Sequence, residues 1–289
     1  MNFRRQVLDI GKLAVYVILS AIFLIPFIWI VLGSLRAENE ILKYLFPFGF
    51  RTFVPIKWTM ESYITVMGWN ATGRAAGYNF GRNVFNSFFV ATAVVLCSLV
   101  FNTMGAYFFA RLRFPKKSWL LMLVLATFLL PFEATIVPLY MVVRDLGLDN
   151  TYWALIVPWY ASPFVIFSLV QFMRDAIPYE LDEAALMDGA GFGRILWTII
   201  VPNAIPGLVT NALLEFQFIW NLFYWPLIAV SDRTIQVLPV VIAGTLGQTQ
   251  QYWGRTFAGS ALATLPVVVI FLMLQRYYVQ GIANSGVKG

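Results

Sequence analysis

The chain has 289 residues, of which 60% are hydrophobic and 12% are charged, and its formal net charge is +6. Soluble domains contain roughly 45–50% apolar residues, so this composition indicates an integral membrane protein. The sequence contains no histidine and a single cysteine, Cys97, which excludes a disulfide and a Cys/His metal site within the chain. The basic residues lie at the ends of apolar runs, where they anchor a protein to lipid headgroups, and we expect no nucleic-acid partner.

Six apolar stretches are long enough to cross a bilayer, since ~20 helical residues cover its hydrocarbon core. The first is too long for a signal peptide and is followed by no small-residue cleavage site, so we interpret it as a retained helix. The sequence thus predicts an all-α integral membrane protein with six transmembrane helices in one domain over 1–289. These spans lie at about 13–35, 84–109, 119–142, 153–172, 205–230 and 257–278.

Two further segments accompany the spans. A run at 235–244, "IQVLPVVIAG", is too short to cross and is expected at the interface or as a re-entrant segment. The segment at 36–83 is rich in Gly, Asn and aromatic residues, which indicates a loop with one short helix.

Basic residues in short loops indicate the orientation. The totals on the two sides are nearly even, but the local contrast is informative. The third stretch is followed by Arg144 alone, whereas the second is followed by Arg111, Arg113, Lys116 and Lys117. We therefore expect both termini in the cytoplasm, the polar gap at about 174–204 on the same side, and the segment at 36–83 outside.

The polar gap opens with a predicted helix over about 178–188. Pro178 suits the first turn of a helix, and the carboxylates that follow lie near the positive end of the helix dipole. Five of the 14 acidic residues fall in this part of the chain: Asp175, Glu180, Asp182, Glu183 and Asp188. Two alanines are expected on one face, where another backbone can approach, within the i, i+3, i+4, i+7 set Leu181, Ala184, Ala185 and Asp188.

A glycine elbow and a second helix complete the gap. Gly189, Gly191 and Gly193 permit the left-handed conformation that turns a chain sharply after a helix. An apolar stripe then predicts an amphipathic helix along the membrane surface until Pro202 and Pro206 break it, namely Phe192, Ile195, Leu196, Ile199 and Ile200. The whole gap is either a docking knob for a soluble partner or a solvated loop between spans.

The stretch "EAALMDGAGFGRILWTIIVP", residues 183–202, resembles the E-A-A-x3-G-x9-I-x-L-P signature of permease subunits of bacterial and archaeal ABC importers. Val201 stands where the signature usually has Leu. Four other stretches are similar to the maltose-type carbohydrate subfamily: "FARLRFPKK", "PLYMVVRDLGLDNTYWALIVP", "FIWNLFYWPLIAVSD" and "QRYYVQGIANSGVKG". The signature matches at Glu183, Ala184, Ala185, Gly189, Ile199 and Pro202.

The resemblance implies the type I ABC importer permease fold in the cytoplasmic (inner) membrane. It implies a heterodimer with a second permease, two ATPase subunits that bind ATP and Mg, and an extracellular solute-binding protein that delivers a sugar or related small polar solute. It also implies that the gap is a coupling helix received by the ATPase subunit, with contacts or turns provided by Glu183, Ala184, Ala185, Asp188, Gly189 and Pro202.

Two other functions are alternatives to this one. The chain has no G-x-x-x-x-G-K-[ST] phosphate loop, so it is not expected to be an enzyme, and a partner would hydrolyse ATP. A membrane-embedded hydrolase would use Glu133 and Glu215 as paired carboxylates. An ion-coupled secondary transporter or channel would use Glu133 as a relay in a helix broken by Pro131 and Pro138, but such a transporter needs no docking knob.

The fifth span is the most polar. Asn211, Glu215, Gln217 and Asn221 fall within about 160° of a helical wheel, and amides beside aromatic rings suit a sugar. Alternatively, these groups join the subunit to its partner by hydrogen bonds between helices. A structural role is expected for Glu215. The candidates for the solute pathway are Asn211, Glu215, Gln217, Trp220 and Asn221.

Overall fold

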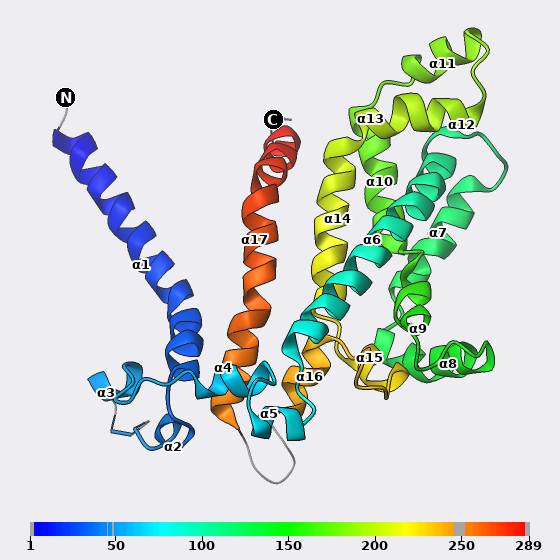
Figure 1. Cartoon of the computed structure of the whole chain (residues 1–289). Helices are drawn as coiled ribbons and strands as arrows, with labels where there is room; N and C mark the ends of the chain where they lie inside the picture. The colour runs from blue at the N-terminus through cyan, green and yellow to red at the C-terminus, as the bar shows by residue number, and fades with distance from the viewer. Residues whose placement is uncertain (1–2, 45, 48, 246–251, 287–289) are drawn as a thin grey trace. The chain divides into compact units, whose positions relative to one another are not determined.

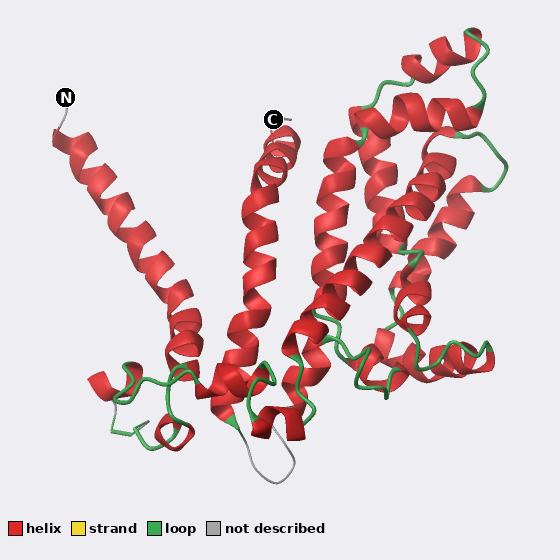
Figure 2. Cartoon of the chain, viewed as in Figure 1, coloured by secondary structure: helices red, strands yellow, loops and turns green. Residues whose placement is uncertain are grey.

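The computed structural model describes residues 3–44, 46–47, 49–245 and 252–286, and the side chains within these ranges from residue 11 to residue 273. Helices and their connections account for this part of the chain, without a β-strand (Figure 2). The predicted all-α class is confirmed. Part of the last quoted stretch, residues 287–289, lies outside the described residues.

Three helices are long and apolar enough to cross a membrane within the described ranges: α1 (Phe3–Ser34), α6 (Phe80–Arg111) and α17 (Trp253–Gly286). They correspond to the first, second and sixth predicted spans. Most of the described side chains along α1 are exposed and apolar, and exposed apolar side chains also occupy the described part of α17 from Leu265 to Met273. A lipid environment accounts for such surfaces, because hydrocarbon does not penalise them as water does.

The other three candidate spans are bent helix pairs. The first joins α7 (Lys117–Phe128) to α8 (Phe132–Asp145) at 97°, and the second joins α9 (Tyr152–Ile156) with η1 (Val157–Trp159) to α10 (Pro163–Ala176) at 41°. The third joins residues 192–203 to α14 (Ile205–Trp220) at 78°. The predicted spans 119–142 and 153–172 are therefore each broken into two helices. Two breaks lie directly before a proline, Pro131 and Pro163, and the residue before a proline disfavours the α conformation. Pro206 lies in the first turn of α14, just after the third break.

The predicted fifth span, 205–230, is also interrupted. Helix α14 ends at Trp220, and α15 (Tyr224–Ala229) starts after a turn. Pro226 explains the interruption, because it lacks the N–H that a continuous helix would need and its ring would clash with the preceding turn. The short run at 235–244 contains α16 (Leu238–Gly244).

The chain divides into two compact units, 1–82 with 241–266 and 83–240 with 267–289. In the first unit, the segment after α1 holds four short helices where the sequence predicted one: α2 (Glu38–Ile41), α3 (Phe50–Phe53), α4 (Glu61–Val66) and α5 (Ala71–Ala75). Asn70 begins α5 by accepting a hydrogen bond from the Gly73 amide at 2.7 Å. Local side-chain caps of this kind escape a search for apolar periodicity.

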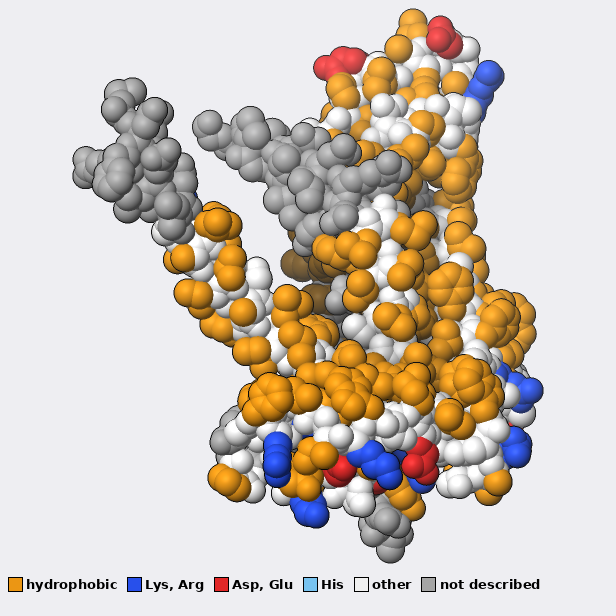
Figure 3. Space-filling model, turned by 60° about the vertical axis from the view of Figure 1, so that its left-hand side comes forward, with side chains coloured by type: hydrophobic (Ala, Val, Ile, Leu, Met, Phe, Trp, Pro, Cys, Tyr) orange, Lys and Arg blue, Asp and Glu red, His pale blue; other side chains and the backbone are white. Residues whose placement is uncertain are grey.

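In the second unit, α6, α7, α10 and α14 form a helical bundle (Figure 1). The short helices α11 (Glu180–Met187), α12 (Phe192–Ile195) and α13 (Val201–Asn203) lie at one end of it, hereafter the coupling end. Charged side chains are visible at the coupling end, whereas hydrophobic side chains cover the sides of the helices (Figure 3). One apolar cluster fills the coupling end, with members from α6, α10, α11 and the helix after it.

Candidate functional site

Helix α11 ends in the predicted glycine elbow. Gly189 has φ +79°, the left-handed conformation that glycine adopts without steric cost. Its amide donates to the Leu186 carbonyl at 3.0 Å, and the Ala190 amide donates to the Ala185 carbonyl at 2.9 Å. These two bonds are the Schellman termination of a helix. The left-handed prediction is confirmed for Gly189 only, because Gly191 has φ −75° and Gly193 lies inside α12.

The two sides of α11 differ in what they contact. Asp182 and Ala185 point into the apolar cluster of the coupling end and are 9% and 7% exposed. The expectation that both alanines share an outward face is therefore wrong, since Ala185 packs inside this chain. The outward residues, hereafter the coupling face, are Glu183, Ala184, Leu186 and Met187.

The helix after the elbow is one continuous stretch over residues 192–203. Its middle, η2 (Leu196–Ile200), is a π-helical turn, a form that occurs as single turns inside α-helices and is frequent at functional sites. Ile195, Leu196 and Ile200 are buried as the predicted stripe requires, whereas Phe192 is 57% exposed. Pro202 does not break the helix, which continues through Asn203 and turns at Ala204.

Arg111, the last residue of α6, binds the ends of two other helices. Its Nη2 donates to the carbonyls of Met173 at 2.7 Å and Ile177 at 2.6 Å, at the end of α10. Its Nε lies 3.4 Å from Oδ2 of Asp182 on α11, and its guanidinium lies over the Tyr179 ring, 4.2 Å from the centroid. We call this arrangement the Arg111 clamp.

The end of α6 is held reciprocally by neighbouring side chains. Arg174 Nη2 donates to the Phe109 carbonyl at 3.1 Å, and the Tyr179 hydroxyl donates to the Ala110 carbonyl at 3.3 Å. Lys117 Nζ donates to the carbonyls of Ala110 and Leu112. Cations are favoured at helix C-termini, where carbonyls lack partners inside the helix. Arg111 and Lys117, which the sequence presented as lipid anchors, are thus engaged in the protein itself.

Asp182 is the acidic member of the clamp. Burial raises the pKa of the Asp182 carboxyl above its ordinary value, and the Arg111 guanidinium offsets part of this effect. Oδ1 of Asp182 and both Nε and Nη1 of Arg111 are buried without a hydrogen-bond partner in the described structure, so the Nε–Oδ2 contact is an ion pair and not a hydrogen bond. One ionic contact therefore compensates only part of the cost of removing both charges from water.

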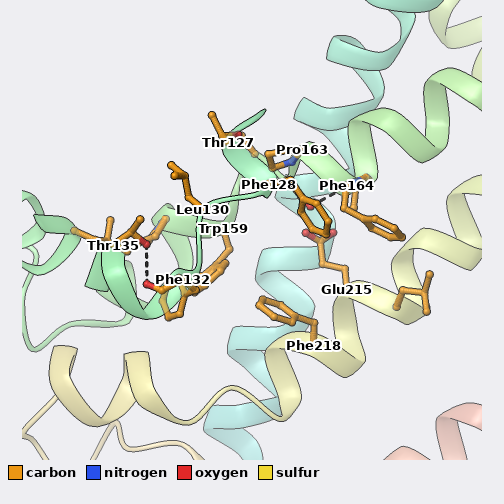
Figure 4. A pocket seen from close by; sticks show the side chains of 16 residues that line it. Thr127, Phe128, Leu130, Phe132, Thr135, Trp159, Pro163, Phe164, Glu215 and Phe218 are labelled. Carbon is orange, nitrogen blue, oxygen red and sulfur yellow. Dashed lines mark hydrogen bonds between the residues drawn. The ribbon is translucent and has the colours of Figure 1, made fainter. Parts of the chain in front are cut away.

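A cavity of about 740 Å³ opens in the second unit beside α14 (Figure 4). Aromatic rings form much of its wall, and Glu215 reaches it from α14. The buried Nε1 of Trp159 and Oε2 of Glu215 have no hydrogen-bond partner in the described part of the chain. The lining residues are Thr127, Phe128, Leu130, Phe132, Thr135, Leu139, Pro158, Trp159, Ala161, Ser162, Pro163, Phe164, Val165, Leu214, Glu215 and Phe218.

A hydrogen-bond chain holds Glu215 in place. The Ser98 hydroxyl donates to Oε1 of Glu215 at 2.6 Å, and the Asn102 amide donates to the Ser98 hydroxyl. Asn102 Oδ1 in turn accepts from the Ser162 amide at 2.9 Å, at the start of α10. Sequence reasoning missed these partners, although the i, i+4 spacing of Ser98 and Asn102 within an apolar span is a signal that finds them.

The predicted polar face of α14 does not stay together. Asn211 is buried and donates to Ser168 Oγ at 3.0 Å and to the Gly207 carbonyl at 2.9 Å. Gln217 and Asn221 are exposed, and Asn221 Nδ2 donates to the Gln217 carbonyl at 2.7 Å. Thus Asn211 and Glu215 join helices, whereas Gln217 and Asn221 remain available to another molecule.

Trp220 and Glu133 are the remaining residues that the sequence singled out within the spans. Trp220 is buried and stacks on Phe216, with ring centroids 5.6 Å apart. Glu133 is exposed in the first turn of α8, so it is not paired with Glu215 inside the bundle. Within the described residues, no group of three His, Cys, Asp or Glu is placed to hold a metal ion.

Known proteins resemble the chain in sequence and in fold. Residues 102–284 match the family of binding-protein-dependent transport system inner membrane components. The chain is 34% identical to the trehalose transport system permease protein SugB of Mycobacterium tuberculosis, over 90% of this chain and 97% of the relative. It is 31% identical to the trehalose/maltose transport system permease protein MalG of Thermococcus litoralis, over 99% of each.

One solved structure shares the fold. It belongs to a bacterial ABC transporter involved in the import of the acidic polysaccharide alginate, with a TM-score of 0.76, 21% identity, and coverage of 96% of this chain and 99% of that chain. The fold therefore agrees with the type I permease architecture that the motif implied. Together with the match over 102–284, these relatives show that the chain belongs to the membrane-embedded permease subunits of ABC importers, in which ATP hydrolysis resides in a separate subunit.

Proposed function

We propose that this chain forms half of the translocation pathway of an ATP-driven importer for a neutral sugar. It pairs with a second, different permease, and an extracellular binding protein delivers the sugar. The named solutes of its relatives support this class, since they include trehalose, lactose and maltose. Nothing favours the alternative of an ion-coupled transporter, whose relay candidate, Glu133, is exposed.

The cavity supports a sugar as the solute class. Sugars present C–H faces that stack on aromatic rings and hydroxyls that need donors and acceptors. Phe132, Trp159 and Phe218 provide ring surfaces, and the hydroxyl residues Thr127, Thr135 and Ser162 add polar groups to the lining. Gln217 and Asn221, both exposed on α14, provide amides nearby along the chain.

We further propose that α11 docks into an ATPase subunit that binds ATP and Mg, and that it does so through the coupling face. Met187 is 88% exposed and Leu186 is 48% exposed at the charged end of the bundle. Exposed apolar side chains rimmed by carboxylates are typical of a protein-interaction site. Glu183 offers a charged hydrogen bond at the same face, and Gly189 makes the turn that leads α11 back to the bundle. This end of the bundle and both termini would therefore lie in the cytoplasm.

The experiment compares two carboxylates added to the same elbow. Gly189→Asp places a side chain where φ is +79°, which L-residues resist, whereas Gly191→Asp places it at φ −75° at an N-cap, where Asp is favoured. No atom lies within 4 Å of a Cβ built at either glycine, so the comparison isolates the backbone conformation.

Tagged permease is purified with its partner permease and ATPase subunits, and uptake of labelled trehalose and maltose is measured in the same cells. Gly189→Asp is expected to keep the partner permease and to lose the ATPase subunits and uptake together. Gly191→Asp is expected to behave as the unaltered protein. Retention of the ATPase subunits and of normal uptake by Gly189→Asp would refute docking through α11.

A further inference from the structure

Arg111 and Asp182 connect the docking helix to the membrane spans. We infer that the Arg111 clamp is the joint that makes α11 move together with the ends of α6 and α10, so that Asp182 is a positioning residue for coupling. This inference rests on the proposed docking of α11 into an ATPase subunit.

The geometry of the clamp brings three helices to one side chain. The guanidinium holds the last carbonyls of α10 through Met173 and Ile177, and it holds α11 through Asp182. Because Arg111 is itself the last residue of α6, any displacement of α11 acts directly on the end of that span. The covalent link from α10 to α11, residues 177–179, meets α6 at its end, where the Tyr179 hydroxyl donates to the Ala110 carbonyl and the Ile177 carbonyl accepts from Arg111.

Burial makes this joint stiff. The side chains of Arg111 and Asp182 are 2% and 12% exposed, so water does not screen their attraction as it does at a surface. Moving α11 away from α6 would separate two opposite charges inside the protein, and the planar guanidinium would lose its fixed directions toward carbonyls and carboxylate. Asp182 also projects from the side of α11 opposite the coupling face, so an ATPase subunit can hold that face without disturbing the clamp.

This arrangement separates docking from transmission. Loss of the Asp182 carboxylate leaves Glu183, Ala184, Leu186 and Met187 in place for the ATPase subunit. We therefore expect Asp182→Ala transporters to bind the ATPase subunits and to hydrolyse ATP, but to lose most of the transport per ATP hydrolysed. A residue of the docking surface would instead lose the ATPase subunits.

The test measures whether α11 and α6 move as one body. Nitroxide labels are placed at Leu96→Cys and Glu180→Cys in a Cys97→Ser background, within the complete transporter in lipid nanodiscs. Leu96 is 61% exposed on α6, roughly 22 Å along the helix from Arg111 at 1.5 Å per residue, and Glu180 is exposed at the start of α11. Distance distributions are recorded without nucleotide and after trapping with ATP and vanadate.

In the otherwise unaltered protein we expect one narrow distance that trapping does not change. In Asp182→Ala we expect a broader distribution that shifts on trapping, together with retained ATPase subunits. Asp182→Asn keeps the shape of the side chain, and we expect its distance distribution to be intermediate in width and in shift. This variant replaces Asp182→Ala in the test if the alanine variant does not assemble. Asp175→Ala removes an exposed carboxylate from α10 and is the matched control that should behave as the unaltered protein.

The outcomes separate the two proposals. If the unaltered transporter fails to hold ATPase subunits through α11, the proposed function is wrong. The clamp is not a joint if the unaltered transporter holds the ATPase subunits and is trapped by ATP and vanadate, but the Asp182 variants do not differ from it. In that case Asp182→Ala and Asp182→Asn would show the same label distances and the same ratio of transport to ATP hydrolysis as the unaltered protein. A shift on trapping in the unaltered protein would also overturn the inference, because α11 would then move independently of α6.

Discussion

Two buried carboxylates in the same unit are held in different ways. Asp182 at the coupling end lies 3.4 Å from a guanidinium nitrogen, whereas Glu215 in the bundle accepts a hydroxyl hydrogen bond from Ser98 and, within the described residues, forms no ion pair. Asp182 sits among helix ends, where carbonyls and cations gather. Glu215 sits among helix sides, where only side chains can satisfy it because the backbone groups are already paired.

The difference predicts which partner each carboxylate needs. In the ion pair of Asp182 with Arg111, the arginine matters more for stability than the carboxylate, because Arg111 also donates to two backbone carbonyls. At Glu215 the hydrogen bond is critical, because a neutral amide can accept it equally from Ser98. Changes that remove charge but keep shape are therefore expected to be mild at both sites, and changes that remove the partner are expected to be severe only at Asp182.

The largest expected effect follows from Arg111→Met. This change leaves the Asp182 carboxylate buried without a cation and frees the carbonyls of Met173 and Ile177. Breaking a buried ion pair by removing one member costs about 3–5 kcal/mol. The fraction of permease that stays monodisperse in detergent after heating should fall sharply. Asp182→Asn is the control and should be close to the unaltered protein. Equal losses in both would show that the carboxylate matters as much as the cation.

A smaller effect is expected at Glu215. Glu215→Leu leaves the Ser98 hydroxyl without its acceptor, at a cost of about 1–3 kcal/mol for an unsatisfied buried group. Glu215→Gln keeps an acceptor and should be tolerated better. The same heating assay measures both. If leucine were as well tolerated as glutamine, the carboxylate would serve the solute in the cavity and not the packing of α6 against α14.

The elbow tests whether α11 is held by its turn or by the clamp. Gly189→Ala should cost about 1 kcal/mol, because φ is +79° and no neighbour crowds the new methyl group. Gly191→Ala, at φ −75°, should cost nearly nothing. The distance between labels on α6 and α11 should stay narrow in both variants. Broadening in Gly189→Ala would show that the turn, and not Arg111, fixes α11.

The smallest expected effect is a pH dependence at Asp182. Since burial raises the pKa of Asp182 in the folded protein above its ordinary value of 3.8, the folded state keeps a proton that the unfolded chain has released. The contribution of Asp182 to the free energy of unfolding is therefore largest at low pH, falls as the pH rises through the folded-state pKa, and is constant above it. Asp182→Asn should remove the part of the slope that begins near the ordinary value of 3.8 and ends at the folded-state pKa. An unchanged slope would assign the dependence to another group.

The coupling end was the best predicted part of the molecule. Its elements depend on local signals: carboxylates early in α11, a glycine at the left-handed position that follows α11, and an apolar stripe in the next helix. The orientation of α11 was predicted less well. Leu181, Ala184, Ala185 and Asp188 share a helical spacing, but periodicity does not say which neighbour lies beneath, and the cluster from α6 and α10 takes Ala185.

The sequence by itself determined the membrane setting, the family signature, the long spans α1, α6 and α17, and the left-handed turn at Gly189, because apolar length, motif and backbone conformation are properties of contiguous residues. Only the tertiary structure showed that Arg111 reaches Asp182, that Ser98 reaches Glu215, and that the polar side chains of α14 divide between interior and surface. These contacts join residues 71 and 117 positions apart in the chain. They depend on how helices bend near Pro131, Pro163 and Pro206 and then pack, and no periodicity within one segment encodes that arrangement.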